Sequence, residues 1–113
     1  MLSKEQRKQA AHQFRERKVR AGVYAIRCTT TSIVWVGTSR NLDTAQNSNW
    51  FALRIGGHRD KPLQDEWLAN QEPAFTFEVL ESIEEDTPAL LVADQLKSAK
   101  QRWLARLGAR GLL

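Results

Sequence analysis

Two short runs of strand-forming residues, separated by a polar turn, constrain the fold of this chain more than any other feature. The first run covers residues 22–28 and places Tyr24, Ile26 and Cys28 on one face. The second run covers residues 33–36, is rich in β-branched side chains and ends at Gly37. The residues between the runs are threonines and a serine, which suit a turn. This pattern predicts a β-hairpin.

Helical patterns precede and follow the predicted hairpin. Ser3 and Gln6 have the spacing of a capping box, so a helix is expected to start there. Asn41 or Asp43 can cap the helix after the hairpin, which two glycines end. Thr87 as a cap, followed by a proline at the first helical position, indicates the start of the last helix. The expected helices cover residues 3–20, 42–55, 62–70 and 88–107.

Alternating apolar side chains over residues 75–80 predict a third strand. At 113 residues, the chain is long enough for one domain with a single core and too short for two. We therefore expect an α/β (α+β) fold, with a small three-stranded, mainly antiparallel sheet flanked by helices. Residues 1–21 are expected to form a basic N-terminal helix, and residues 22–113 the domain itself. Its core should include Trp50, Trp67 and Trp103.

The charged residues are unevenly distributed along the chain, whose net charge is +4. The first twenty residues contain seven Lys or Arg and only two Glu. Nine acids and no cation lie between Asp65 and Asp94, and only cations follow. Two basic ends around an acidic middle suggest one face for a polyanion such as nucleic acid, or simply solvated helix faces. The candidate nucleic-acid contacts in the first segment are Arg15, Arg17, Lys18 and Arg20.

Other features of the sequence indicate the cellular compartment in which the protein is expected. No apolar run approaches the ~20 residues that a membrane-spanning helix needs. Charge from Lys4 onward is unlike a secretory signal, although a basic, amphipathic start can mimic a mitochondrial transit peptide. Cys28 is the only cysteine, which fits a reducing compartment. A cytoplasmic protein without a membrane partner is expected, and its oligomeric state is left open.

Several short motifs resemble those of the GIY-YIG nucleases. Gly22-Val23-Tyr24 and Trp35-Val36-Gly37 resemble the paired GIY and YIG elements of that family. Residues 38–42 look like its loop into the first core helix, and residues 77–81 are similar to its third strand. Gly57-His58 with Leu63-Gln64 resembles its G-x-H-x-x-L-Q pattern. The likeness extends from about residue 22 to residue 107.

The resemblance implies hydrolysis of a DNA phosphodiester at one divalent metal ion, Mg²⁺ or Mn²⁺. The family's site combines a tyrosine from each of the first two strands, a helical arginine and a later glutamate. A carboxylate holds the metal, which polarises the phosphate, and the arginine neutralises developing charge. A tyrosine hydroxyl near the metal-bound water can take part in proton transfer.

Only part of that site can be transferred to this sequence. Tyr24 matches the first tyrosine, whereas Trp35 replaces the second and cannot relay a proton. Ala45 stands where the arginine is expected; the neutral Gln46 and Asn49 lie nearer that face, and Arg40 is the closest cation with a plausible reach. No Glu follows Glu85, which leaves Asp94 as the candidate metal ligand in the last helix, with the strand acid Glu78 as the alternative. The candidate catalytic residues are Tyr24, Trp35, Arg40 and His58.

Each candidate also has a structural interpretation. Tyr24 and Trp35 can be packing residues, His58 a surface-loop histidine, and Asp94 one partner of a helix-surface ion pair. Three functions therefore stay open: a metal-dependent endonuclease with a variant site, a degenerate nucleic-acid-binding module, and a protein-interaction scaffold. If the chain is an endonuclease or a nucleic-acid-binding module, Tyr24, Trp35 and His58 should face one shared concavity with Arg40 at its rim.

Overall fold

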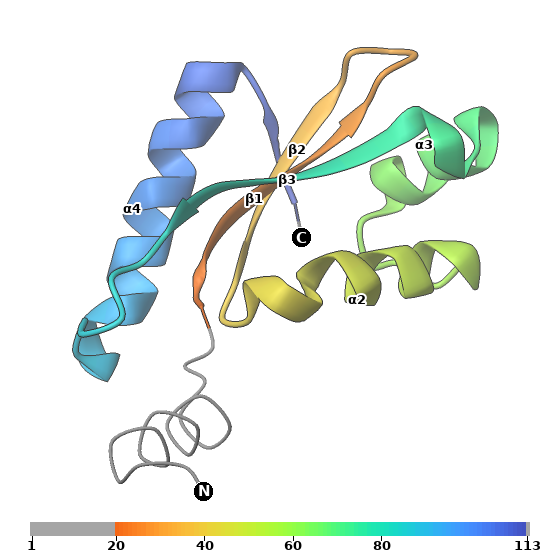
Figure 1. The fold of residues 1–113 in the computed structure, drawn as a ribbon. Coiled ribbons are helices and arrows are strands. Elements are labelled where there is room, and N and C mark those ends of the chain that lie inside the picture. Colours follow the sequence, from red (N-terminus) through yellow and green to blue (C-terminus); the bar gives the residue numbers. More distant parts are fainter. Residues whose placement is uncertain (1–19, 113) are drawn as a thin grey trace, which may run out of the picture.

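The computed structural model describes residues 20–112 (Figure 1). The expected N-terminal helix lies outside the described residues, and so do Arg15, Arg17 and Lys18. The described part contains a four-stranded sheet, three α-helices and one short 3-10 helix. None of the helices within residues 20–112 combines the length and the apolar character that a bilayer span requires.

The sheet has the strand order β3-β1-β2-β4. Strand β1 (Gly22–Cys28) lies between β2 (Val34–Ser39) and β3 (Phe75–Ser82) and is antiparallel to both. The expected hairpin is confirmed, and its turn is closed by hydrogen bonds between Cys28 and the residues Ser32 and Ile33. The three expected strands are all present.

A fourth strand was missed by the sequence analysis. Strand β4 (Arg110–Gly111) pairs in parallel with β2, which makes the sheet mixed. Two residues are too few to show the alternation by which a strand is recognised. The amide of Leu112 extends this ladder by donating to the Val36 carbonyl at 2.9 Å.

The helices α2 (Leu42–Arg54), α3 (Lys61–Asn70) and α4 (Ala89–Leu107) lie close to the expected ranges, and η1 (Glu72–Ala74) precedes β3. Asn41 is the cap of α2, because its side chain accepts from the Asp43 amide at 3.1 Å. The prediction that Thr87 caps α4 is wrong. Pro88 takes the cap position without a side-chain hydrogen bond, and the Thr87 amide closes a turn to Glu84.

The two faces of the sheet are covered by different helices, with α4 on one side and α2 and α3 on the other (Figure 1). Tyr24, Ile26 and Trp35 belong to the core cluster under α2 and α3. Val23 and Val36 pack with Ala99 on the α4 side. This division follows from the alternation of side chains along β1 and β2. Of the expected core tryptophans, Trp50 and Trp67 are buried, whereas Trp103 is half-buried against the α4 side of the sheet.

Candidate functional site

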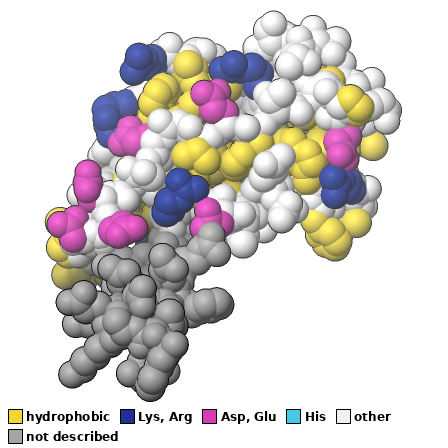
Figure 2. All heavy atoms as spheres, viewed as in Figure 1, with side chains coloured by type: hydrophobic (Ala, Val, Ile, Leu, Met, Phe, Trp, Pro, Cys, Tyr) yellow, Lys and Arg dark blue, Asp and Glu magenta, His cyan; other side chains and the backbone are white. Residues whose placement is uncertain are grey.

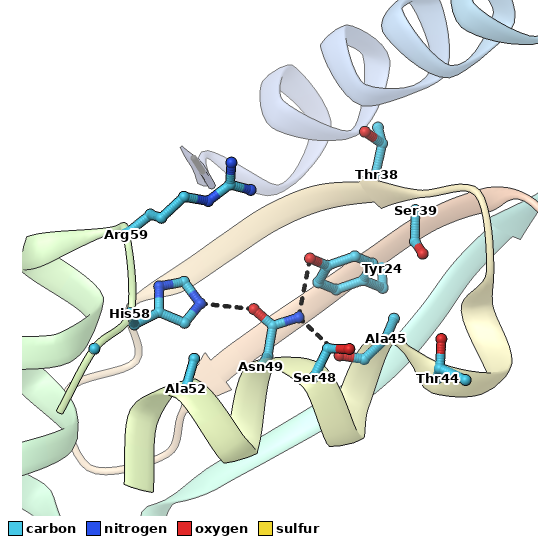
Figure 3. Close-up of a pocket in the computed structure, with 11 residues that line it drawn as sticks. Tyr24, Thr38, Ser39, Thr44, Ala45, Ser48, Asn49, Ala52, His58 and Arg59 are labelled. Atoms are coloured by element: carbon cyan, nitrogen blue, oxygen red, sulfur yellow. Dashed lines mark hydrogen bonds between the residues drawn. The ribbon is translucent and has the colours of Figure 1, made fainter. Parts of the chain in front are cut away.

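A pocket of about 260 Å³ opens between the end of β2, helix α2 and the loop before α3 (Figure 3). Tyr24 and His58 line it, together with Asn49 and Arg59. The hydroxyl groups in its wall belong to Thr38, Ser39, Thr44 and Ser48. The lining contains no carboxylate. We refer to this hollow as the Tyr24 pocket.

Asn49 is the centre of a hydrogen-bond network in the Tyr24 pocket. Its Nδ2 donates to the Ala45 carbonyl at 2.8 Å and to the Tyr24 hydroxyl oxygen at 3.1 Å. The Ala45 carbonyl fixes the orientation of the amide, because the reversed amide would place two acceptor oxygens against each other. The Oδ1 atom of Asn49 therefore faces His58 as an acceptor, at 2.7 Å from Nε2 (Figure 3).

This orientation also determines the protonation of His58. Since Asn49 Oδ1 accepts, the Nε2 atom of His58 must carry a hydrogen. Its Nδ1 atom accepts from the Asp60 amide at 3.0 Å and so carries none. His58 is consequently a neutral imidazole with both nitrogens occupied. Burial lowers its pKa, with the nearby Arg59 acting in the same direction and the charge of Asp60 opposing, which agrees with the neutral form.

The loop that carries His58 is held on both sides. The buried Gln64 side chain accepts from the His58 amide at 3.1 Å and donates to the Leu53 carbonyl at 3.1 Å, which ties the loop to the end of α2. Asp60 caps α3 through its contact with the Leu63 amide at 3.1 Å. The motif residues His58, Leu63 and Gln64 thus act together to fix the imidazole in place.

Tyr24 presents its hydroxyl group to the pocket as a donor. Burial raises the pKa of this hydroxyl, and the hydrogen bond from Asn49 and the charge of Arg59 only partly offset that effect. The phenol is therefore protonated at neutral pH, and with one lone pair engaged by Asn49, its hydrogen is available to a ligand. The ring stacks on Phe77 with centroids 5.0 Å apart.

The position opposite Tyr24, residue 37, requires a glycine. The two residues face each other across the β1–β2 ladder. A Cβ atom added at Gly37 would lie 2.9 Å from the Tyr24 hydroxyl oxygen and 2.8 Å from a methyl carbon of Leu112. The absence of a side chain at this position allows the phenol to lie directly over β2.

The structure brings together only two of the four candidate catalytic residues. Tyr24 and His58 share the pocket, as expected. Trp35 lies on the same face of the sheet as Tyr24 but is 1% exposed and does not line the pocket. Arg40 lines a different hollow, beside α4. The expectation that Trp35 shares a concavity with Tyr24 and His58 is therefore wrong, and so is the expectation of Arg40 at the rim of that concavity: period-two alternation identified the correct face, but not the depth of the indole or the direction of the loop.

The remaining candidates lie away from the Tyr24 pocket. Arg20 is exposed and forms an ion pair with Asp43 at 3.1 Å. Asp94 is exposed on α4 and lines neither hollow. Glu78, an acid on β3, lies opposite Ala25 on the ladder and is 3.9 Å from Arg27.

Two pocket residues were missed as candidates. Asn49 lies near the expected arginine position, but as a neutral residue it does not stand out as a catalytic candidate. Its importance depends on its contacts with Tyr24 and His58, which no pattern along the helix relates to it. Arg59 directly follows His58 and reaches over the pocket from the loop, so its place beside a predicted site residue was the available signal (Figure 3).

The Tyr24 pocket does not offer the carboxylate ligands that Mg²⁺ or Mn²⁺ prefers. Both ions prefer carboxylate and other oxygen ligands. The Tyr24 pocket has no acidic side chain in its lining, and within residues 20–112 no three His, Cys, Asp or Glu side chains gather into a metal-binding group. We therefore derive no metal-assisted step from this site.

Comparison with known proteins supports the expected fold. No protein-family model and no curated protein matches the sequence. Among solved structures, the catalytic domain of homing endonuclease I-TevI matches with a TM-score of 0.64 and 21% identity, over 82% of this chain and 98% of that domain. A mutant of the same catalytic domain, described as that of an intron endonuclease, matches with a TM-score of 0.69 and 21% identity, over 84% and 93% of the two chains. The chain thus shares the fold of this catalytic domain, and the GIY-YIG resemblance is confirmed at the level of the fold.

Proposed function

We propose that this chain binds DNA and that the Tyr24 pocket receives a backbone phosphate. The observation that most supports this proposal is the network that fixes Tyr24 as a hydroxyl donor beside Arg59. A phosphate requires hydrogen-bond donors and positive charge, and the pocket supplies both. Its lining adds further hydroxyl groups and no carboxylate that would repel the anion.

Within this proposal, His58 is a positioning residue. Both of its nitrogens are engaged by protein atoms, so it has no free lone pair with which to take a proton from a water molecule. It holds the Asn49 amide, which in turn orients the Tyr24 hydroxyl group. Arg59 is exposed and can approach a phosphate with two N–H groups at once.

DNA is proposed rather than a small anion because the fold is that of an endonuclease catalytic domain. The net charge of +4 also favours a polyanion. RNA has the same backbone phosphates, so a direct comparison of the two nucleic acids belongs in the test.

Metal-dependent cleavage of DNA is the second candidate function, favoured by the same structural similarity. It requires a carboxylate at the metal, and Asp94 is the acid of α4 that the sequence resemblance assigns to that role. A cleaving enzyme would then lose its Mg²⁺- or Mn²⁺-dependent activity in Asp94→Asn. Binding is our primary proposal because the described pocket provides phosphate contacts without metal ligands.

The test combines binding and cleavage. Fluorescence anisotropy with labelled single- and double-stranded DNA and RNA in EDTA is expected to show binding, weakened about fivefold in Arg59→Gln. Arg27→Gln is the matched control, because it removes the same charge from a residue that does not line the pocket. Absence of binding at low salt would overturn the proposal and leave the scaffold interpretation. Nicking of circular DNA with Mg²⁺ or Mn²⁺, but not EDTA, would establish the endonuclease.

A further inference from the structure

A second hollow of about 390 Å³ lies on the α4 side of the sheet. The end of β2 and the following loop contribute Thr38, Ser39 and Arg40 to its wall. Helix α4 contributes Lys97 and Lys100, together with the apolar residues Ala93 and Leu96. Every ionisable side chain in this lining is a cation. We call it the α4 hollow.

These cations differ from most other arginines of the described domain, which have acidic partners. Arg20, Arg27, Arg54 and Arg102 each form an ion pair with Asp or Glu. Figure 2 shows a face of the molecule on which basic and acidic side chains lie next to one another. Within residues 20–112, neither Arg40 nor Lys97 forms an ion pair with an acid. Unneutralised cations around a concave surface attract an anion.

The α4 hollow and the Tyr24 pocket share one wall. Thr38 and Ser39 line both of them. Their side chains point in opposite directions, Thr38 toward α4 and Ser39 toward Tyr24 and Ala45 (Figure 3). Strand β4 pairs with β2 at Trp35 and Val36, and Leu112 donates to the Val36 carbonyl, so within the described range no residue of this edge pairs with Thr38 or Ser39. The two hollows therefore meet across the end of one strand.

We propose that the two hollows bind two phosphates of the same nucleic-acid strand, which crosses β2 at Thr38 and Ser39. This inference rests on the proposed function of the Tyr24 pocket and extends it to a second, independently testable phosphate site. Arg59 and Tyr24 contact one phosphate, and Arg40 and Lys97 contact the other. The ligand class is a strand with at least two phosphodiesters, and a single phosphate group occupies only half of the site.

Lys97 is the better probe of the α4 hollow. Lys100 donates to the Leu112 carbonyl at 3.1 Å and so fastens β4 to α4, which means that its substitution would also disturb the sheet. Lys97 is exposed and forms no hydrogen bond or ion pair within the described range. Its replacement by glutamine removes one charge and leaves the fold intact.

The experiment compares thymidine dinucleotide, which has one phosphodiester, with the trinucleotide, which has two. Dissociation constants are measured by NMR titration at low salt in EDTA. We expect the wild-type protein to bind the trinucleotide about fivefold more tightly. In Lys97→Gln and Arg40→Gln this advantage should largely disappear, while dinucleotide affinity changes less than about twofold. Arg59→Gln should weaken both ligands.

A salt titration with a longer single strand gives a second readout. Each phosphate contact contributes about 0.7 to the slope of log affinity against log salt. Lys97→Gln should lower that slope, and Arg27→Gln should leave it unchanged. A trinucleotide advantage that persists in Lys97→Gln with Arg40→Gln would overturn the second site. Failure of the wild-type protein to bind any oligonucleotide would instead overturn the proposed function itself.

Discussion

The two sides of the sheet place polar groups near the end of β2 in contrasting ways. On the α2 side, Tyr24, Asn49 and His58 are fixed by hydrogen bonds to one another and to the backbone. On the α4 side, Arg40 and Lys97 are exposed side chains without such partners in the described residues. The first arrangement provides directed hydrogen bonds at little further cost in conformational entropy. The second provides long-range attraction that salt screens.

This contrast predicts different sensitivities. Changes on the α2 side should alter stability, pH response and the geometry of binding. Changes on the α4 side should alter salt dependence and leave the fold nearly unaffected.

The largest expected effect is that of Gly37→Ala. The new methyl group would meet the Tyr24 ring and Leu112 at under 3 Å, so one of them must move. We expect a loss of ~2 kcal/mol in the free energy of unfolding, measured with urea. Gly57→Ala is the control, because its Cβ would be 3.7 Å from Ile55. Equal stabilities of the two variants would show that Tyr24 is not held against β2.

Asn49→Asp should have the next largest effect. A carboxylate at this position faces the Ala45 carbonyl and accepts from the Tyr24 hydroxyl, which turns the phenol hydrogen away from a ligand. We expect a loss of ~1 kcal/mol in stability and about tenfold weaker DNA binding. Asn47→Asp introduces the same charge at an exposed position of α2. If Asn47→Asp weakens binding equally, charge alone accounts for the result.

The lowered pKa of His58 predicts that the pH dependence of stability changes with substitutions on the α2 side and not with those on the α4 side. Its pKa in the folded protein is lowered from 6.5. Between the folded pKa and 6.5, the unfolded chain binds more protons than the folded one. The contribution of His58 to stability is therefore complete above pH 6.5 and decreases as the pH falls below it. Urea denaturation at a series of pH values should show a shallower acid slope in His58→Gln, whereas Lys97→Gln should keep the wild-type slope.

The smallest expected effect belongs to Asp94→Asn. Asp94 is exposed and lines neither hollow, so stability should change by less than about 0.5 kcal/mol. DNA affinity should be equal or slightly raised, because one negative charge is removed from a helix that borders the α4 hollow. Anisotropy measurements in EDTA check this expectation. A metal-dependent cleavage activity that disappears in Asp94→Asn would instead give Asp94 the metal role.

Features that involve neighbouring residues could be predicted from the sequence, whereas features that join distant residues could not. The hairpin and the Asn41 cap were predictable because period two and capping chemistry involve neighbouring residues. Strand β4 was not, because its two residues pair with Trp35 and Val36, far away in the sequence. The polar network was only half predictable. Tyr24 and His58 belong to recognisable motifs, whereas Asn49 connects them only when α2 packs against β1.

Tyr24 is the only tyrosine of the chain, and this makes the pocket observable by spectroscopy without any label. Its ionisation produces a tyrosinate absorption band that no other residue contributes. Because burial raises the pKa of Tyr24, the band should emerge at higher pH than in a free phenol. A bound phosphate would disfavour the phenolate and shift the transition further upward. An alkaline absorbance titration, repeated with and without oligonucleotide, would thus report occupancy of the Tyr24 pocket from the intrinsic chromophore of the protein.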